Sequence, residues 1–440
     1  MPLVSIIMPS LNVAGYIDEC LKSATNQTLR DIEIICIDAG STDGTREIIE
    51  KYVTIDSRIK LIDSTVKSYG FQVNLGIQEA KGEYIAILET DDYVDQEMYE
   101  RLYSCACECN AEYVRADYDE ICEVNNYMIC NTQHIFNNSL YYDKLFDNRY
   151  FKELFSKDQN IWSGIYKKSF LEKYHIRLNE TPGAAFQDIG FKLLTLIYAE
   201  RIMYINYSGY RYRLDRDGCS SCNNNVLKFA WQEFARLLNQ MDLSMSDRFK
   251  YVILRMIDVF ICEHNKLVTK NSAGDQEKFY ETYIKPYYFE FKKSINGFLL
   301  DGVVSKEDMS ELQFMTLMSL LHNEEDYNNT IIQDKEKKEN SWNELADKLK
   351  DSQIVIVSYG VRGKDALKQL IIRNMNVVAI CDNSSEVRAQ KIGVPIFSVE
   401  VATGLYKNAA YVISNKKYSD ELKNQLISYG VSKANIIQMP

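Results

Sequence analysis

The stretch AKGEYIAILETDDY, residues 80–93, combines three signals that decide the architecture of the first part of the chain. Gly82 is typical of the end of a helix, and the apolar run YIAIL at 84–88 is typical of a buried strand. The acidic cluster Glu89-Thr90-Asp91-Asp92 follows that strand directly. Carboxylates at the end of a buried strand are expected where a parallel sheet presents polar side chains to a ligand.

The residues before this stretch alternate between apolar runs and helical periodicity. Helices are predicted where apolar residues recur at helical spacing, at 12–24, 45–53 and 68–80. Strands that alternate with helices of this length predict an α/β fold with a parallel sheet covered on both faces. The preceding strands are predicted at 4–8, 32–37 and 59–62, and Pro9 is expected to end the first of them.

Acidic side chains fall at two of these predicted strand ends. Asp38 begins the turn DAGSTDGT at 38–45, and the cluster at 89–92 ends the fourth strand. Carboxylates that converge there would repel one another unless a cation lay among them. Mg²⁺ or Mn²⁺ suits oxygen ligands and commonly bridges substrate phosphates. The alternative is that Asp91 and Asp92 only cap a helix beginning near Val94.

Two phosphate-binding motifs are absent from the sequence. No G-x-G-x-x-G follows the first strand, which argues against a dinucleotide site there, and no G-x-x-x-x-G-K-[ST] is present, which argues against a P-loop. The phosphates of a nucleotide would therefore have to be held by a metal ion rather than by a glycine loop.

The composition is that of a globular protein. The 440 residues are 46% apolar and 26% charged, and the net charge of −11 argues against a nucleic-acid partner. Eleven cysteines, with no predicted signal peptide or membrane span, favour a reducing compartment. We expect a cytoplasmic protein, and leave open peripheral contact with the inner face of the membrane and assembly into an oligomer. The lone CxxC at 219–222 does not suit a closed zinc site.

Ordered motifs over about the first 225 residues resemble glycosyltransferase family 2, which has the GT-A fold. The resemblance is carried by VSIIMPSLN at 4–12, IDAGSTDGT at 37–45, NLG at 74–76 and the stretch at 80–93. Further motifs resemble a branch common among surface-polysaccharide enzymes, namely IWSGIY at 161–166, NETPGAAFQD at 179–188, YRYR at 210–213 and GCSS at 218–221.

The resemblance implies inverting, metal-dependent transfer of a sugar, hexose or N-acetylhexosamine, from a nucleotide-sugar, expected to be a UDP-sugar. The acceptor would be a glycan or a lipid-linked molecule in surface polysaccharide synthesis. The alternative is a non-catalytic module that binds a sugar nucleotide or acts as a scaffold, and Glu89 favours it because many members carry aspartate there. The implied cofactor is Mn²⁺ or Mg²⁺.

Individual roles also follow from the resemblance. Asp188 matches the catalytic base, although Asp188 could instead cap a helix at 189–199. Asp38 matches the residue that contacts uracil. Gln72-Val73-Asn74 stands where the family has A-R-N, so an arginine contact is lost at Val73. The implied donor-binding residues are Pro9, Asn12, Asp38, Ser41, Asn74, Glu89, Asp91, Arg213 and Ser221; the metal ligands are Asp91 and Asp92; the acceptor or sugar contacts are Trp162 and Gln187.

The remainder of the chain divides into two further regions. Residues 226–350 are predicted to be a helical region that ends in a polar helix or linker, after a domain at 1–225. Residues 351–440 return to strand–helix alternation and resemble a small Rossmann-like module. Its turn keeps only Gly360-x-x-Gly363 of the dinucleotide motif, while Asp382 lies where a ribose-binding acid would be expected. The module could bind a second nucleotide or sugar nucleotide, or serve only for docking.

Overall fold

The computed structural model describes residues 1–124, 127–136, 138–146, 151–214, 223–241, 246–270, 276–388 and 393–440, which form two compact units. Unit 1 contains residues 1–119 and 132–328, and unit 2 contains residues 120–131 and 329–440. Residues 226–328, which the sequence suggested as a separate helical region, therefore group with the N-terminal sheet.

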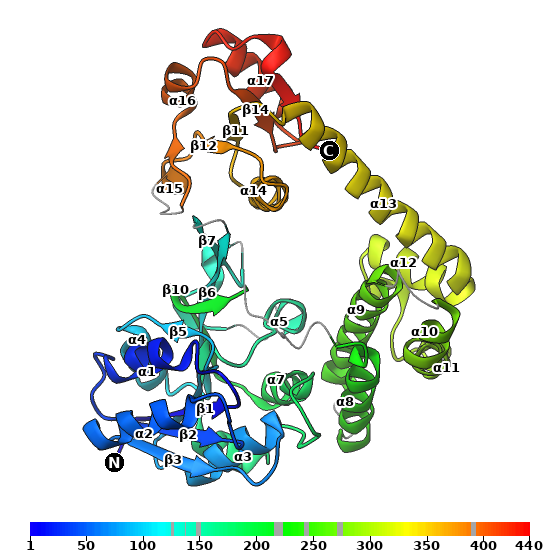
Figure 1. Ribbon diagram of the computed structural model, residues 1–440. Coiled ribbons are helices and arrows are strands. Elements are labelled where there is room, and N and C mark those ends of the chain that lie inside the picture. Colours follow the sequence, from blue (N-terminus) through cyan, green and yellow to red (C-terminus); the bar gives the residue numbers. More distant parts are fainter. Residues whose placement is uncertain are drawn as a thin grey trace. The chain divides into compact units, whose positions relative to one another are not determined.

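The N-terminal half of the unit 1 sheet is parallel, as predicted. Its strands β1 to β4 lie in the order β3-β2-β1-β4 (Figure 1). The predicted helices are present, although α1 begins later than expected. The bounds are β1 Val4–Ser10, α1 Ile17–Thr25, β2 Ile32–Asp38, α2 Thr45–Ile55, β3 Ile59–Asp63, α3 Tyr69–Glu79 and β4 Tyr84–Ile87.

The two faces of this sheet are covered by different helices. Ile6 and Met8 of β1 share a buried core with Ile17 and Leu21 of α1. The opposite face packs on α3, where a Cβ on Gly76 would lie 2.5 Å from the Ile7 side chain. Alternate residues of one strand thus face two helices, which explains why β1 is buried throughout.

Pro9 does not end β1, contrary to the prediction. The strand continues to Ser10, and Pro9 pairs in register with Ile37 of β2. The Leu88 N–H donates to the Ile7 carbonyl, so the backbone groups of residues 7 and 9 face the side of β4. Strand β4 ends at Ile87 and does not extend beside Pro9. The sheet therefore loses no hydrogen bond through the missing N–H of proline.

The second half of the unit 1 sheet is antiparallel, which the alternation in the first ninety residues did not foresee. Strand β9 runs antiparallel to β4 and β6, and β10 runs antiparallel to β5. The complete order is β3-β2-β1-β4-β9-β6-β10-β5, so the fold is a mixed α/β sheet. The bounds are β5 Tyr93–Val94, α4 Met98–Cys109, β6 Tyr113–Val124, β7 Tyr127–Gln133, β8 Lys144–Leu145, α5 Phe151–Lys157, β9 Gly164–Lys167, α6 Lys168–Lys173, α7 Gln187–Tyr198 and β10 Ile202–Arg213.

Helices follow the sheet, as predicted. Helix α10 ends at Tyr283, and Pro286 lies in the first turn of the next helix, α11. The polar segment after residue 323 is a single helix, α13, rather than an irregular linker. The bounds are α8 Val226–Gln240, α9 Ser246–Lys270, α10 Gln276–Tyr283, α11 Lys285–Leu300, α12 Glu311–His322 and α13 Glu324–Leu349.

Unit 2 is built on a parallel sheet with the strand order β13-β12-β11-β14-β15 (Figure 1). Trp342, Leu345 and Leu349 of α13 are buried in its core, against Ile354 and Ile356 of β11. The bounds are β11 Ile354–Val357, α14 Val361–Ile372, β12 Val377–Cys381, α15 Ser385–Arg388, β13 Ile396–Phe397, α16 Val399–Leu405, β14 Ala410–Ile413, α17 Ser419–Ser428 and β15 Ile436–Gln438.

Among the residues that the structure describes, no helix is both long enough and apolar enough to cross a membrane.

Candidate active site

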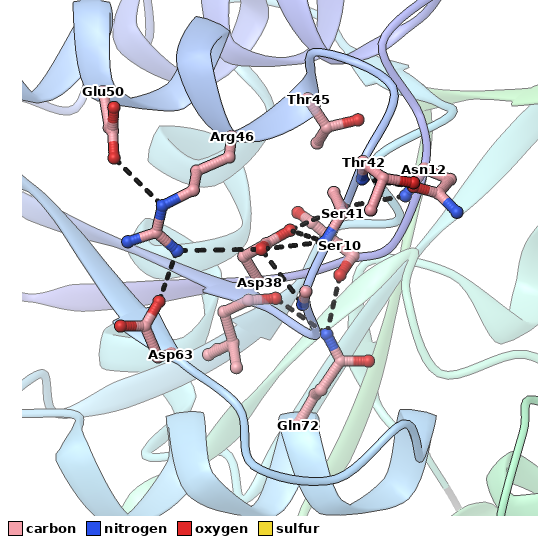
Figure 2. A network of polar contacts seen from close by, with 12 residues as sticks. Ser10, Asn12, Asp38, Ser41, Thr42, Thr45, Arg46, Glu50, Asp63 and Gln72 are labelled. Atoms are coloured by element: carbon pink, nitrogen blue, oxygen red, sulfur yellow. Dashed lines mark hydrogen bonds and ion pairs between the residues drawn. The ribbon is translucent and has the colours of Figure 1, made fainter.

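The carboxyl ends of β1 and β2 carry a polar network centred on Asp38 (Figure 2). The Asp38 side chain is 1% exposed and accepts a hydrogen bond of 2.5 Å from the Ser41 hydroxyl and one of 3.1 Å from the Ser41 N–H. The Ser41 hydroxyl accepts the Asn12 N–H at 2.9 Å, and the Asn12 side chain accepts the Thr42 N–H. The network joins the loops after β1 and β2, which brings three predicted donor-binding residues together.

A cation also lies beside Asp38. Arg46 of α2 lies 3.8 Å from the Asp38 carboxylate and pairs with Asp63, at the end of β3, and with Glu50. Figure 2 shows the guanidinium between these three carboxylates. Arg46 thus places a positive charge beside the buried side chain of Asp38 at the strand end.

Gln72 of α3 holds the two strand ends from the other side (Figure 2). Its amide nitrogen donates to the Ser10 carbonyl at 3.0 Å and to the Ile37 carbonyl at 2.7 Å. Gln72 is therefore a buried structural link between β1, β2 and α3.

We expect the variant Gln72→Leu to unfold more easily, by about 1–3 kcal/mol, because two buried carbonyls would lose their donor. Denaturant unfolding of unit 1 measures this change. The control is Gln78→Leu, which alters an exposed glutamine on the same helix and should change stability by less than about 0.5 kcal/mol. Equal stability of the two variants would contradict the structural role of Gln72.

The acidic cluster after β4 is held by tyrosines. The Tyr69 hydroxyl of α3 donates to Glu89 at 2.5 Å, and the Tyr210 hydroxyl of β10 donates to Asp92 at 2.8 Å. The second oxygen of Asp92 accepts the Arg213 N–H at 2.8 Å. Asp92 is therefore buried and bound to β10 through both carboxylate oxygens.

Burial raises the pKa of Asp92 well above its usual range, and the charge of Asp91 raises it further. A cation beside these residues would relieve this repulsion. Among the described residues no three His, Cys, Asp or Glu side chains form a ready metal cluster. The donor set nevertheless fits a cation that takes one or two protein carboxylates and completes its shell with substrate oxygens. Asp91 and Glu89 suit this role better than Asp92, whose oxygens already accept two hydrogen bonds.

Arg213 closes one side of the acidic cluster. Its Nε donates to the Asp91 carbonyl at 3.0 Å, and its guanidinium pairs with Glu19 of α1 at 2.7 Å. The guanidinium also lies over the rings of Tyr16 and Tyr93. Arg213 is thus anchored next to the predicted metal ligands, where a diphosphate would need positive charge.

Asp188 lies in the first turn of α7. The helix begins at Gln187 with Phe186 as its N-cap, so Asp188 is not the capping residue. Burial raises the pKa of Asp188, while the nearby backbone N–H groups and the charge of Arg255, on α9, lower it. Arg255 was not singled out from the sequence, because only the packing of α9 near α7 reveals it.

The loop before Asp188 is fixed from two directions. Asn74 of α3 donates to the Leu178 carbonyl at 2.9 Å and accepts the Leu178 N–H at 3.0 Å. Asn179 donates to Glu233 of α8 at 2.9 Å. Gly70 is needed at the same contact, because a Cβ there would collide with the Asn179 carbonyl. Asn74, predicted to bind the donor, thus has its amide engaged in holding this loop.

The two predicted acceptor contacts are largely engaged within the protein. Gln187 donates to the Thr181 carbonyl at 2.6 Å, and its amide oxygen is buried without a hydrogen-bond partner. Trp162 is 9% exposed and stacks on Tyr210 and Tyr212, with ring centres 4.2 and 5.0 Å apart. Trp162 therefore supports the tyrosine that binds Asp92.

The remaining predicted donor-binding residues are Pro9 and Ser221. The Pro9 carbonyl accepts the Thr90 hydroxyl at 2.8 Å, which fixes the start of the acidic cluster to β1. Ser221 lies outside the described residues, as do Cys219 and Cys222. Tyr69 and Tyr210 were not predicted as site residues, since tyrosine is common in this chain; Tyr210 lies in the YRYR motif, but the motif gave its hydroxyl no role.

Tyr69 links the two halves of this site. Its hydroxyl donates to Glu89, and the charges of Glu89 and Asp188 both help to raise its pKa, after burial as the main cause. The acidic cluster and Asp188 are thus neighbours, although about a hundred residues separate them in sequence. A parallel half-sheet with a carboxylate cluster at its end and a second carboxylate opposite is the arrangement of a GT-A glycosyltransferase.

Comparison with known proteins gives the same class. A family model described as glycosyl transferase family 2 matches residues 5–172. Glycosyltransferase GlyG of Streptococcus pneumoniae is 30% identical over 216 residues, covering 48% of this chain and 70% of GlyG. Glycosyltransferase GlyA of the same organism is 27% identical over 225 residues, or 49% of this chain, but the match spans only 31% of GlyA.

A solved structure shares the fold. Staphylococcus aureus TarS, in a crystal structure with UDP-GlcNAc, superposes with a TM-score of 0.56 at 17% identity, covering 77% of this chain and 92% of that one. The chain belongs to glycosyltransferase family 2, and its class of reaction is the transfer of a sugar from a nucleotide-sugar.

Proposed function

We propose that the protein transfers a sugar from a UDP-sugar, with inversion at the anomeric carbon, and that Asp188 is the base. The observation that carries this proposal is that Tyr69 donates a hydrogen bond to Glu89 and lies near enough to Asp188 for the charge of Asp188 to help raise the Tyr69 pKa. Donor-side carboxylates and a separate carboxylate on the opposite side are the minimum needed for a single displacement, in which the base takes the proton of the acceptor hydroxyl.

The donor end of the proposal rests on the Asp38 network. A buried carboxylate that is fixed by Ser41 and partly balanced by Arg46 offers an oriented acceptor for the N–H of a uracil ring. TarS, which shares the fold, was solved with UDP-GlcNAc, and this favours a UDP-sugar over other donors. We leave the choice between a hexose and an N-acetylhexosamine to experiment.

The diphosphate would lie between the acidic cluster and Arg213. Asp91 and Glu89 would hold Mn²⁺ or Mg²⁺, which supplies positive charge to the departing diphosphate. Asp92 would orient this region rather than bind the ion, since Tyr210 and the Arg213 N–H already engage it. Arg213, anchored by Glu19, would place a guanidinium beside the phosphates.

The acceptor would approach from the side of Asp188. A cavity of about 200 Å³ in unit 1 is lined by Arg255, whose charge acts on Asp188, by Tyr251 and Asp258 of the same helix α9, and by Phe155 of α5. Mixed charged and aromatic side chains suit a glycan or the head of a lipid-linked acceptor. Surface polysaccharide synthesis at the inner face of the membrane, by an oligomer or a single chain, is compatible with this proposal.

The rival is a non-catalytic sugar-nucleotide-binding module. A screen of UDP-sugars for hydrolysis in the presence of Mn²⁺ separates the two. We expect release of UDP from one donor, and much less from the others, because a water molecule can replace the acceptor at the base. Tight binding of a donor without any turnover, with or without a mixture of glycan acceptors, would favour the rival.

A further inference from the structure

Unit 2 contains a cavity of about 420 Å³ that the proposed transfer does not use. Ser358, Asp382 and Asn415, which follow β11, β12 and β14, lie in its wall. The chain adds β12 and β13 on one side of β11 and then β14 and β15 on the other side. The order in which strands are added therefore reverses between β11 and β14. Ligands of open parallel sheets bind at such reversal points, and the volume lies within the range of about 300–1,000 Å³ for small-molecule sites.

Several polar groups of the wall are available to a ligand. Asn415 accepts the Tyr418 N–H at 3.0 Å through its oxygen, and its amide nitrogen has no partner among the described residues. The Glu421 carboxylate likewise forms no ion pair or hydrogen bond with any residue that the structure describes. Tyr418 completes this side with an aromatic ring that is 44% exposed.

The charge of the wall argues against a nucleotide. It contains the carboxylates of Asp382 and Glu421 and no lysine or arginine. Lys417 lies over the Tyr418 ring but outside the wall. A dinucleotide fold holds its diphosphate at the first turn of the corresponding helix. In this protein the first turn of α14 lies outside the cavity wall, and Val361 at its start is 88% exposed. A diphosphate placed here would meet two negative charges without a compensating positive charge.

We propose that this cavity binds a neutral saccharide. Carboxylate and amide groups can hydrogen-bond pairs of sugar hydroxyls, and the exposed Tyr418 ring can pack on the apolar face of a sugar ring. The assignment goes beyond the proposed transfer, because it gives unit 2 its own ligand instead of a second nucleotide.

The backbone at the floor of the cavity supports a ligand site. Ser358 has a φ of +73°, in the left-handed region that non-glycine residues rarely adopt. Such strain is found preferentially where a chain is shaped for a ligand. The turn is held in place by α14, since a Cβ on Gly363 would collide with the Ser358 carbonyl. Beside it, Asn383 and Gln425 exchange two amide hydrogen bonds of 3.0 and 3.2 Å, which tie β12 to α17.

Saturation-transfer NMR on the full chain tests the proposal. The probes are glucose, galactose, N-acetylglucosamine, rhamnose and their β-linked disaccharides, with UDP and Mg²⁺ present to fill the donor site. We expect at least one saccharide to bind, and the variants Tyr418→Ala and Glu421→Gln to weaken it by about tenfold each, the usual worth of a lost charged hydrogen bond.

The matched control is Tyr429→Ala, because Tyr429 is equally exposed at 44% but lies outside the cavity wall, directly after α17. Binding should be unchanged in this variant. The proposal is overturned if no saccharide binds in the presence of UDP, if the two cavity variants bind as tightly as the control, or if added NAD displaces the saccharide. Because binding is measured rather than transfer, the result is independent of whether the UDP-sugar is turned over.

Discussion

Asp188→Asn is expected to lower the rate of sugar transfer by about two to four orders of magnitude, the usual contribution of a positioned general base. Asparagine keeps the size of the side chain but cannot take the proton from the acceptor. Donor affinity should hold, because Asp188 is not among the predicted donor contacts, so kcat falls while donor binding stays constant. Transfer kinetics and calorimetric titration with UDP measure the two quantities.

Folding supplies the control for this variant. Asp188 is the second residue of α7 rather than its cap, so asparagine forfeits only its interaction with the helix dipole, about 0.3–1 kcal/mol. A melting temperature close to that of the unmodified chain is therefore expected. A variant that transfers sugar at the normal rate would show that another group is the base.

The pH dependence gives an independent check on Asp188. Burial raises the pKa of this carboxyl, so the protonated, inactive form persists to higher pH than for an exposed aspartate. The rate should fall as the pH drops through that raised pKa. Since the charge of Arg255 lowers the same pKa, Arg255→Gln should move the acidic limb to still higher pH. If the acidic limbs of the pH–rate profiles coincide for the unmodified chain and the Arg255→Gln variant, Asp188 is not the titrating base.

Removal of the metal ion is expected to have the second large effect. UDP should bind at least about tenfold more tightly with Mn²⁺ or Mg²⁺ than with EDTA, and Asp91→Asn should abolish this difference. The reason is that the acidic cluster repels a diphosphate unless a cation lies between them. Titration of UDP by calorimetry, with and without EDTA, measures the effect.

Two further variants make this experiment specific. Asp31→Asn changes an exposed carboxylate at the opposite end of β2 and should preserve the whole metal effect. Asp92→Asn should reduce it less than Asp91→Asn does, because the Asp92 oxygens are engaged by Tyr210 and the Arg213 N–H. Equal UDP affinity in EDTA and in Mn²⁺ for the unmodified chain would exclude the metal role altogether.

Local pattern was sufficient to place the predicted donor-side residues at strand ends. Apolar runs and helical spacing are short-range signals, and parallel strands align their carboxyl ends, so Asp38 and the cluster at 89–92 could be placed at one edge. The same reasoning failed at Pro9, because its effect depends on where the neighbouring strand β4 ends. That fact is absent from the sequence around the proline.

The other half of the site depends on contacts between distant residues. Tyr210 and Asp92 are 118 residues apart, and only the antiparallel pairing of β10 with β5 brings that stretch of chain to the cluster. Arg255 approaches Asp188 through helix packing, which periodicity alone does not specify. The motif at 179–188 identified Asp188, but its relation to Glu89 required the fold.

The hydrogen bonds that fix the loop before Asp188 imply an order of folding during synthesis. The donor half is built from consecutive strand–helix units, which need only local contacts and can form early. The loop before Asp188 becomes fixed only when Asn74 forms its hydrogen bonds with Leu178, 104 residues away, and Asn179 forms its hydrogen bond with Glu233 of α8. A growing chain would thus form the Asp38 network well before the loop that carries the proposed base is fixed, and contact with α8 would complete the proposed active site.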